Sequence, residues 1–368
     1  MSALIELFAG CGGAALGLDR AGWRHLACVE RDPAACATLR AVGLPVVEAD
    51  VRAVDWSPWV GSVDLLWASP PCQAGSAAGK RRGRSDDRDG WPWTFAAVDA
   101  LSPIWLLAEN VRGWTFHRPG CPRDGRDLSC VGCYWERVVL PGVRARFPFA
   151  GAWSLDAADY GVPQRRRRVI LSAGPVPLAE APPPPTHGDP RDPGTAARGL
   201  RPWVTLGEAV GASLNRASCD QRRCYPCSKS FGRACKEPGR LALPAPTVTC
   251  QDEKGTRAHA PDWDLHGGPD RASDAAFLVA GIRRVELAEG LLLQGFPADW
   301  PLQGTVHERY VQAGNAVPPA LAEAAGRAML AAHRVLGRVL AQGWATADLT
   351  AALRRRPLAV PTSIEAQP

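Results

Sequence analysis

The chain has 368 residues, of which 46% are hydrophobic, and it carries 43 Lys and Arg against 37 Asp and Glu. This length and apolar content exclude global disorder and allow either one large domain or two smaller ones. The net charge of +6 is compatible with an anionic partner but does not identify one.

Gly and Pro supply 37 and 34 residues without a collagen-like period, so the composition predicts a compact body with long connections. No apolar run reaches the roughly 18 residues needed to cross a bilayer. The N-terminus also lacks the basic-then-apolar order of a signal peptide. We therefore expect a cytoplasmic protein with no membrane partner. Its 12 cysteines should then be metal ligands, a nucleophile or buried hydrophobes before they are disulfides.

Short apolar runs alternate with helical patterns over the first half of the chain. The runs predict strands at residues 3–8, 26–30, 46–50, 63–69, 104–109 and 168–173. Helical patterns end at Gly22 and near Val42, the second beginning at the cap Asp32 and at Pro33, and two more helices are expected around 95–101 and 134–147. This order predicts an α/β fold with a doubly wound, mostly parallel sheet. Ligands of such sheets bind beyond the carboxyl ends of the strands.

The character of the sequence changes at four consecutive prolines, residues 182–185. We expect a catalytic and cofactor-binding domain at 1–173, with an insertion at 112–133. A smaller irregular domain is expected at 174–275, which is rich in Gly, Pro, Arg and Cys. Helical patterns at 285–293 and 318–340 predict a return to the first domain over 276–341. A C-terminal helix and tail should follow at 342–368.

Glycines and acids follow the first three predicted strands. The first strand ends in Phe-Ala-Gly-Cys-Gly-Gly, where a backbone without Cβ atoms can approach a ligand, although such turns also serve tight packing. Glu30 ends the second strand, where an acid suits a ribose diol, and Asp50 ends the third, where an acid could accept a hydrogen bond from an adenine amine. Together they predict a site for a nucleoside-bearing cofactor, formed by Phe8, Ala9, Gly10, Cys11, Gly12, Gly13, Glu30, Arg31, Asp50 and Val51.

Cys72 follows the fourth strand, after two prolines that stiffen the turn. A lone cysteine is usually an inert buried residue. Because the next strand ends in Glu109, a nucleophile paired with an acid is the better interpretation. Farther on, Arg166 and Arg168 alternate and would share one face of an extended segment. A solvated basic run is the alternative.

In this order, the motifs resemble those of the cytosine-5 DNA methyltransferase family. The five matching segments are residues 8–13, 70–73, 109–111, 164–168 and 312–319. The resemblance covers about 1–173 and 276–335. It implies a class I methyltransferase (Rossmann-like) fold, S-adenosylmethionine as cofactor, and target recognition by the region between. The chain departs from the family's pattern by an insertion after Val111 and by Gly75 in place of the usual Phe, which changes the packing of the catalytic loop rather than the chemistry.

The resemblance also implies a role for individual residues. Cys72 would add to C6 of a flipped-out cytosine, Glu109 would stabilise the charge at N3, and Arg166 and Arg168 would hold the base oxygen or nearby phosphates. Pro70 and Asn315 would complete the cofactor site. The partner implied is double-stranded DNA, contacted by Gln73, Ser76, Lys80, Arg81, Arg82, Gln164, Arg222 and Arg223. We expect a monomer in a bacterial or phage-infected cell, and the family admits a cognate restriction endonuclease as a further partner.

Two cysteine clusters lie outside these motifs. One, in the variable region, comprises Cys219, Cys224, Cys227 and Cys235, and the other, in the insertion, comprises His117, Cys121, Cys130 and Cys133. Each contains a Cys-x-x-Cys step, which lets two thiolates bind one tetrahedral ion. Redox pairs and chance are the alternatives. The stretch around the cluster in the variable region is too poor in apolar residues to build its own core. We therefore predict one or two structural zinc ions and a zinc-stabilised recognition domain.

Two other functions share part of this pattern. A tRNA cytosine-5 methyltransferase would have the same catalytic residues but usually no large variable domain. A catalytically silent DNA-binding homologue would have no physical need for Cys72, Glu109 and Asn315 together. Between Arg216 and Arg240, seven Lys and Arg outnumber two acids, which favours duplex DNA as the substrate.

Overall fold

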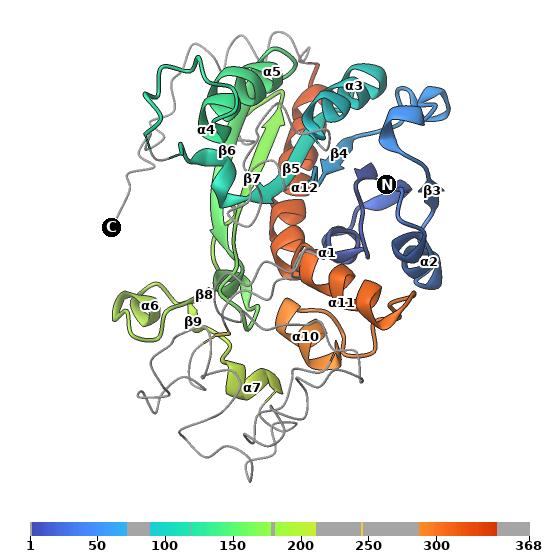
Figure 1. Cartoon of the computed structure of the whole chain (residues 1–368). Helices are drawn as coiled ribbons and strands as arrows, with labels where there is room; N and C mark the ends of the chain where they lie inside the picture. Colours follow the sequence, from blue (N-terminus) through green and yellow to red (C-terminus); the bar gives the residue numbers. More distant parts are fainter. Residues whose placement is uncertain are drawn as a thin grey trace.

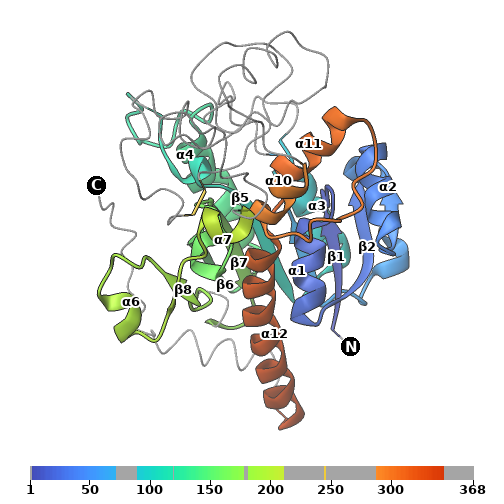
Figure 2. The ribbon, with the colours of Figure 1, turned by 90° about the horizontal axis from the view of Figure 1, so that it is seen from below.

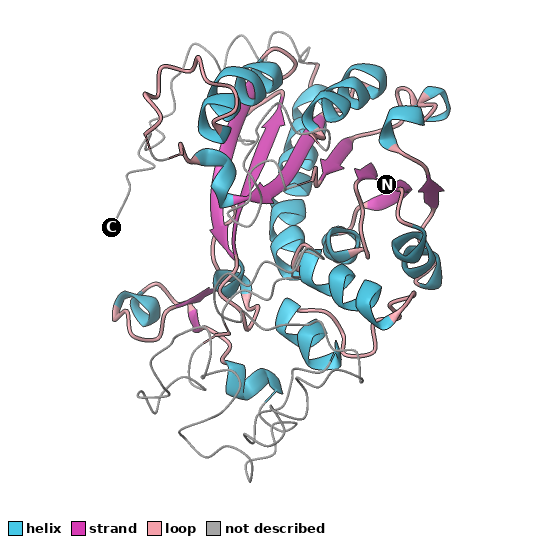
Figure 3. Ribbon diagram, viewed as in Figure 1, coloured by secondary structure: helices cyan, strands magenta, loops and turns pink. Residues whose placement is uncertain are grey.

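The fold is a seven-stranded α/β sheet in the strand order β3-β2-β1-β4-β5-β7-β6. The computed structural model describes residues 2–71, 89–118, 120–177, 181–210, 244–245 and 287–343. The strands are β1 Ala3–Leu7, β2 Arg24–Glu30, β3 Val46–Glu48, β4 Leu65–Ala68, β5 Trp105–Val111, β6 Phe149–Asp156 and β7 Arg167–Gly174. β1 to β5 pair in parallel, and β7 runs antiparallel to both neighbours. The predicted mostly parallel sheet is confirmed (Figures 1 and 3).

Helices cover both faces of the sheet, so the predicted double winding is also confirmed. Side chains alternate along each strand, which sends Leu4 toward one face and Ile5 toward the other. The first face packs against α1 Gly13–Ala21 and α12 Pro319–Ala341. The second packs against α3 Trp91–Leu101, α4 Val131–Tyr134 and α5 Leu140–Arg144. Figure 2 shows α12 lying along α1, although the two helices are about 300 residues apart in sequence.

The ends of the first two helices follow the local chemistry that the sequence predicted. α1 begins after Gly12 and ends at Gly22, both in the left-handed region with φ of 87° and 97°. α2, Pro33–Ala41, begins at Asp32, whose side chain accepts a hydrogen bond from the backbone N–H of Ala35 at 2.9 Å. The caps Gly12 and Asp32 mark where the turns after β1 and β2 end and the helices begin.

Two elements differ from the sequence prediction. The expected helix at 134–147 is α4 and α5 joined by a π-helical turn, Trp135–Val139. Pro141 explains the interruption, because it cannot donate a backbone hydrogen bond to the preceding turn. Strand β6 was not predicted, since Gly151 and small neighbours hide its alternation.

The chain returns to the sheet through α10 Leu287–Gln294, α11 Val306–Asn315 and α12. Helix α11 was not predicted, although Thr305 and Glu308 form a capping box at its start. Four short elements lie below the sheet in Figure 1, namely β8 His187–Gly188, α6 Gly194–Ala197, β9 Arg201–Pro202 and α7 Leu206–Val210. α7 packs through Leu206 and Val210 against Leu293 of α10. Within the described part of the chain, no helix is long and apolar enough to cross a membrane.

Candidate active site and metal centre

The glycine turn after β1 has an unusual backbone. Phe8, Gly10 and Gly12 all have positive φ, of 58°, 55° and 87°. At Gly13 a Cβ atom would collide with the carbonyl oxygen of Val317, in the segment before α12. The first and last motifs of the sequence therefore meet, and glycine is required at this close approach.

Glu30, at the end of β2, holds this turn from the neighbouring strand. Its Oε2 accepts the backbone N–H of Gly10 at 2.8 Å, and its Oε1 accepts those of Arg31 and Asp32 at 2.8 and 2.9 Å. These amides use about three of the four lone-pair positions of a carboxylate. The arrangement leaves Oε2 able to accept one further donor, such as a ribose hydroxyl.

Asp50, the predicted partner of an adenine amine, is paired within its own turn. Its two oxygens accept the guanidinium of Arg52 at 2.9 and 2.7 Å, and Arg31 lies 3.6 Å away. The hydrogen bonds from Arg52 hold the pKa of Asp50 well below its usual range. This bidentate pair, which was not predicted from the sequence, keeps the carboxylate ionised. Val51, the other predicted contact here, is half-buried at the start of the 3-10 turn Val51–Ala53.

The end of β4 is joined to the end of β5. The side-chain amide of Asn110 donates to the carbonyl oxygen of Pro70 at 3.0 Å, and its oxygen accepts the backbone N–H of Val111 at 2.9 Å. A Cβ added at Gly90 would lie 2.7 Å from Pro70 and 2.9 Å from Pro71. The next residues, 72–88, lie outside the described chain, and with them the predictions for Cys72, Gln73, Ser76, Lys80, Arg81 and Arg82.

Glu109 and Arg168 form a buried ion pair between β5 and β7. The Nε of Arg168 lies 2.9 Å from Oε1 of Glu109, and both side chains are about 90% buried. Burial raises the pKa of Glu109, against the opposing effect of Arg168 and Arg166. A buried carboxyl with a raised pKa can give a proton or a hydrogen bond near neutral pH.

The four arginines around the start of β7, residues 165–168, alternate as predicted. Arg165 and Arg167 both pair with Asp156, whereas Arg166 and Arg168 lie on the side of Glu109. The guanidinium of Arg166 also binds the end of α11, because its Nη2 donates to the carbonyl oxygens of Gly314 and Ala316 at 3.0 and 3.1 Å. Arg166 thus joins the end of α11 to the strand beside Glu109.

Three other predicted residues lie close to α10 and α11. Gln164, predicted to contact DNA, is fully buried, and its amide donates to the carbonyl oxygen of Leu293 at 3.0 Å. In this structure it is an internal link and does not reach the surface. Asn315, predicted to contact the cofactor, is exposed at the end of α11. Cys11 is buried, and its thiol lies 3.5 Å from the carbonyl oxygen of Gln312.

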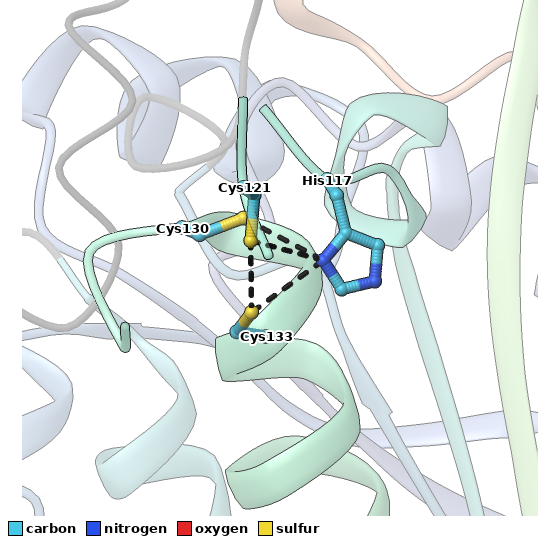
Figure 4. A group of neighbouring side chains, drawn as sticks. All are labelled: His117, Cys121, Cys130 and Cys133. Carbon is cyan, nitrogen blue, oxygen red and sulfur yellow. Dashed lines mark hydrogen bonds between the residues drawn. The ribbon is translucent and has the colours of Figure 1, made fainter. Parts of the chain in front are cut away.

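The four ligand residues predicted in the insertion come together (Figure 4). Nδ1 of His117 lies 3.6, 3.7 and 3.4 Å from the sulfurs of Cys121, Cys130 and Cys133. The sulfurs of Cys121 and Cys133 are 3.4 Å apart, and all four ligand atoms lie within 4.8 Å of one another. A tetrahedral zinc ion with Zn–S of about 2.3 Å and Zn–N of about 2.0 Å requires separations of about 3.8 and 3.5 Å. The cluster fits such an ion with shifts of a few tenths of an ångström.

The surroundings of this cluster also suit thiolates and a metal-bound imidazole. Backbone N–H groups of Arg118 and Arg123 donate to the sulfurs of Cys130 and Cys121 at 3.3 and 3.4 Å. The other ring nitrogen of His117 lies 3.2 Å from a carboxylate oxygen of Glu136. A carboxylate behind a metal-bound histidine fixes the ring and its tautomer. The sequence did not single out Glu136.

A second group of potential ligands was also not predicted. Glu6, His25 and Cys28 are buried between β1 and β2, with Nε2 of His25 3.4 Å from Oε2 of Glu6. Burial raises the pKa of Glu6. The only signal in the sequence is one acid within an otherwise apolar strand.

The larger predicted cysteine cluster and its neighbouring arginines lie in the segment 211–243, outside the described residues. They are Cys219, Cys224, Cys227, Cys235, Arg222 and Arg223.

The chain is similar to known methyltransferases over most of its length. Residues 2–124 and 225–331 match the C-5 cytosine-specific DNA methylase family. The Type II methyltransferase M.NgoMIV of Neisseria gonorrhoeae is 30% identical over 354 residues, which cover 89% of this chain and 97% of that protein. M.Eco47II of Escherichia coli is 30% identical over 348 residues, 89% of this chain and 78% of that protein. The methyltransferase EhMeth of Entamoeba histolytica shares the fold, with a TM-score of 0.56 at 14% identity over 90% of this chain and 98% of that one.

Proposed function

Since this chain belongs to the C-5 cytosine-specific DNA methylase family and methylates C5 of cytosine in DNA with S-adenosylmethionine, we propose that Cys72 is its nucleophile and Glu109 its base-binding acid. The observation that best supports the assignment is the buried pair of Glu109 and Arg168. Glu109 is followed by Asn110, whose side-chain amide donates to the carbonyl oxygen of Pro70. Pro70 lies two residues before Cys72. An acid and a candidate nucleophile thus follow neighbouring strands at the ligand-binding edge of the sheet.

We propose that S-adenosylmethionine binds against the turn at 8–13, with Glu30 accepting from its ribose. The hydrogen bonds that Glu30 makes to the turn support this, because they preorganise both partners before the ligand arrives. Asp50, Arg31, Val51, Pro70 and Asn315 complete the proposed site. When bound, the cofactor supplies an electrophilic methyl group on sulfur.

The proposed reaction follows from what the cytosine ring lacks. C5 is too weak a nucleophile until the thiolate of Cys72 adds to C6 and pushes an electron pair into the ring. Glu109 donates a proton or hydrogen bond at N3, where that charge develops, and Arg168 keeps its carboxyl in place. C5 then takes the methyl group, loses its proton, and expels the Cys72 thiolate. Because C6 is covered by stacked neighbours in a duplex, the base has to be flipped out.

Arg166 receives a positioning role in this scheme. Its guanidinium binds the carbonyls of Gly314 and Ala316, and it also adds positive charge near Glu109. Only Arg168 of the two predicted arginines touches the acid directly.

Target recognition is assigned to residues 174–275, and we propose that they contact duplex DNA together with the segment 72–88. The basic excess between Arg216 and Arg240 supports this. We further propose a monomer that modifies DNA in a bacterial or phage-infected cell, with a cognate restriction endonuclease as a partner in function. The relatives named Type II methyltransferases support the modification of DNA.

We propose that His117, Cys121, Cys130 and Cys133 bind one structural zinc ion. The separations of their ligand atoms support zinc over a disulfide, because four donors surround one point at tetrahedral spacing. With all four positions filled by protein, such an ion would have a structural role. A second zinc ion is proposed at Cys219, Cys224, Cys227 and Cys235 on the spacing of these residues alone.

Bisulfite sequencing of host DNA after expression tests the activity and reveals the target sequence. We expect protected cytosines at one recurrent sequence, and none in cells that express Cys72→Ser. Protection by both proteins would contradict the assignment of Cys72. Methylated tRNA with unmodified DNA would support the RNA alternative.

A further inference from the structure

Tyr134 joins the proposed metal centre to the edge of the active site. It directly follows the ligand Cys133, and its hydroxyl donates to the carboxylate of Asp89. Both residues are buried, with exposed fractions of 1% and 8%. The other carboxylate oxygen of Asp89 accepts the backbone N–H of Trp91 at 3.1 Å, at the start of α3. One buried acid therefore connects the insertion to the start of that helix.

Aromatic rings strengthen the same connection. Trp91 meets Trp114 and Trp135 edge-on, at centroid distances of 6.1 and 5.8 Å. Trp114, just before the ligand His117, lies 5.9 Å from Tyr134. All four rings are buried, so they bring a large packed area to the two ends of the metal-binding segment.

On its other side, this connection reaches the turn that precedes Cys72. Gly90 lies between Asp89 and Trp91, and a Cβ atom there would press on Pro70 and Pro71 at 2.7 and 2.9 Å. Asp89 and Gly90 therefore lie beside the turn of Pro70 and Pro71. The side-chain amide of Asn110 also binds this turn, because it donates to the carbonyl oxygen of Pro70.

We propose that Tyr134 is a positioning residue for methyl transfer, fixed by the metal centre on one side and fixing Asp89 against Pro70 and Pro71 on the other. The proposal rests on the metal centre proposed above. The ligand cage orders the backbone at Cys133, the next side chain holds Asp89, and the packed Gly90 transmits that position to the residues before Cys72. Loss of this link should slow transfer more than it weakens cofactor binding, because Pro70 is one of several proposed cofactor contacts and Glu30, which holds the turn at 8–13, belongs to another strand.

Tyr134→Phe removes the hydroxyl and keeps the ring. We expect a 10- to 100-fold lower kcat for methylation of the target DNA, the range of one lost hydrogen bond to a charged group. KM for DNA and zinc content should stay as in the wild type, and affinity for S-adenosylmethionine should fall by a smaller factor than kcat. The matched control is Tyr160→Phe, which removes a hydroxyl bound to the carbonyl oxygen of Pro183 at 2.8 Å, away from this link, and should keep the wild-type rate.

Substitutions at Asp89 test whether the hydrogen bond to Tyr134, rather than the fold alone, sets the rate. Asp89→Asn can still accept from Trp91 and offer its amide to the oxygen of Tyr134, so it should stay within a few-fold of the wild-type kcat. Asp89→Ala should fall at least as low as Tyr134→Phe, because it also releases the N–H of Trp91, and the double variant should fall no further than Asp89→Ala. A normal kcat for Tyr134→Phe, or additive losses in the double variant, would overturn the proposal. A wild type without zinc would refute the metal centre instead, while the rates of these variants would still decide the role of Tyr134.

Discussion

Glu109 and Arg168 face each other across antiparallel strands, with Nε of the arginine 2.9 Å from Oε1 of the acid. Glu109 lies opposite Ile170, and Arg168 lies opposite Val111, so the pair spans two residues of register. An arginine this close should favour the ionised acid, yet burial has the larger effect and raises the pKa of Glu109. The acid is therefore held in place by its partner and still able to carry a proton.

This balance predicts the pH dependence of methyl transfer. The rate should fall as pH passes the raised pKa of Glu109, because only the protonated acid can donate at N3. Glu109→Gln should lower the single-turnover rate about 10²- to 10⁴-fold and abolish this alkaline fall. Glu323→Gln, which alters a surface pair with Arg327 on α12, is the control and should keep the fall. An unchanged alkaline fall in Glu109→Gln would assign that limb to another group.

Cys72→Ser should abolish methyl transfer and leave cofactor binding nearly intact. The reason is that the turn at 8–13 and Glu30 are held by contacts that do not involve the thiol. With duplex DNA containing 5-fluorocytosine, the wild type should form a stable covalent adduct, since fluorine at C5 cannot leave as a proton does. Denaturing electrophoresis detects the adduct. Normal turnover by Cys72→Ser, or no adduct at a proven target sequence, would refute the covalent mechanism.

The sequence was sufficient to predict which elements carry the site, because these depend on local signals. The caps at Asp32 and Gly22 and the apolar runs of β1 and β5 are read from neighbouring residues, and all agree with the structure. The exceptions are also local. Strand β6 contains Gly151 and small residues that blur its pattern, and the capping box of α11 was present in the sequence but overlooked.

The partners of individual side chains could not be predicted, because they come from distant segments. Alternation put Arg166 beside Arg168, but nothing in the sequence indicated that Arg166 binds Gly314 and Ala316 from almost 150 residues away. The family resemblance implied that Gln164 contacts DNA, whereas the structure buries its side chain against α10. The metal ligands were predictable because their spacing alone implies a common ion, whereas Glu136 behind His117 was not.

Glu30 and Asp50 predict separable effects on cofactor affinity. Glu30→Ala and Asp50→Ala should each weaken binding of S-adenosylmethionine by on the order of 1.5–3 kcal/mol, the range of a charge-assisted hydrogen bond. Glu30→Ala should be the more severe, because it also releases the N–H of Gly10. Calorimetric titration measures both. Glu48→Ala, which removes a surface acid paired with Arg40, is the control. Unchanged affinity in both test variants would mean that the cofactor binds elsewhere.

Zinc content should follow the two cysteine clusters separately. Elemental analysis of Cys121→Ser combined with Cys133→Ser should show one zinc fewer per chain than the wild type. Cys36→Ala, at a buried cysteine outside both groups of potential ligands, is the control and should lose none. The separations around His117 predict this result.

Cys224→Ser combined with Cys227→Ser should likewise lower the zinc content and impair DNA binding, while affinity for S-adenosylmethionine is spared. Arg222 and Arg223 lie between the proposed ligands, so their direction depends on the fold that the ion stabilises. A wild type that is metal-free after growth with ample zinc, yet methylates at full rate, would rule out both centres.

The contact between α1 and α12 gives a prediction about stability that also bears on the cofactor site. A Cβ atom at Gly17 would collide with the carbonyl oxygen of Pro319 and lie 2.7 Å from the backbone N of Glu323. Backbone atoms cannot turn aside as a side chain can, so Gly17→Ala should destabilise the protein by roughly 1–3 kcal/mol or more. Gly337, near the end of α12, has nothing within 4 Å of its added Cβ, and Gly337→Ala should stabilise by about 0.5–1 kcal/mol through helix propensity. Urea unfolding compares the free energies of unfolding of the two variants.

Because α1 begins at the glycine turn, Gly17→Ala should also weaken binding of S-adenosylmethionine, whereas Gly337→Ala should not. Equal stability of the two variants would show that α1 and α12 do not pack this closely in solution.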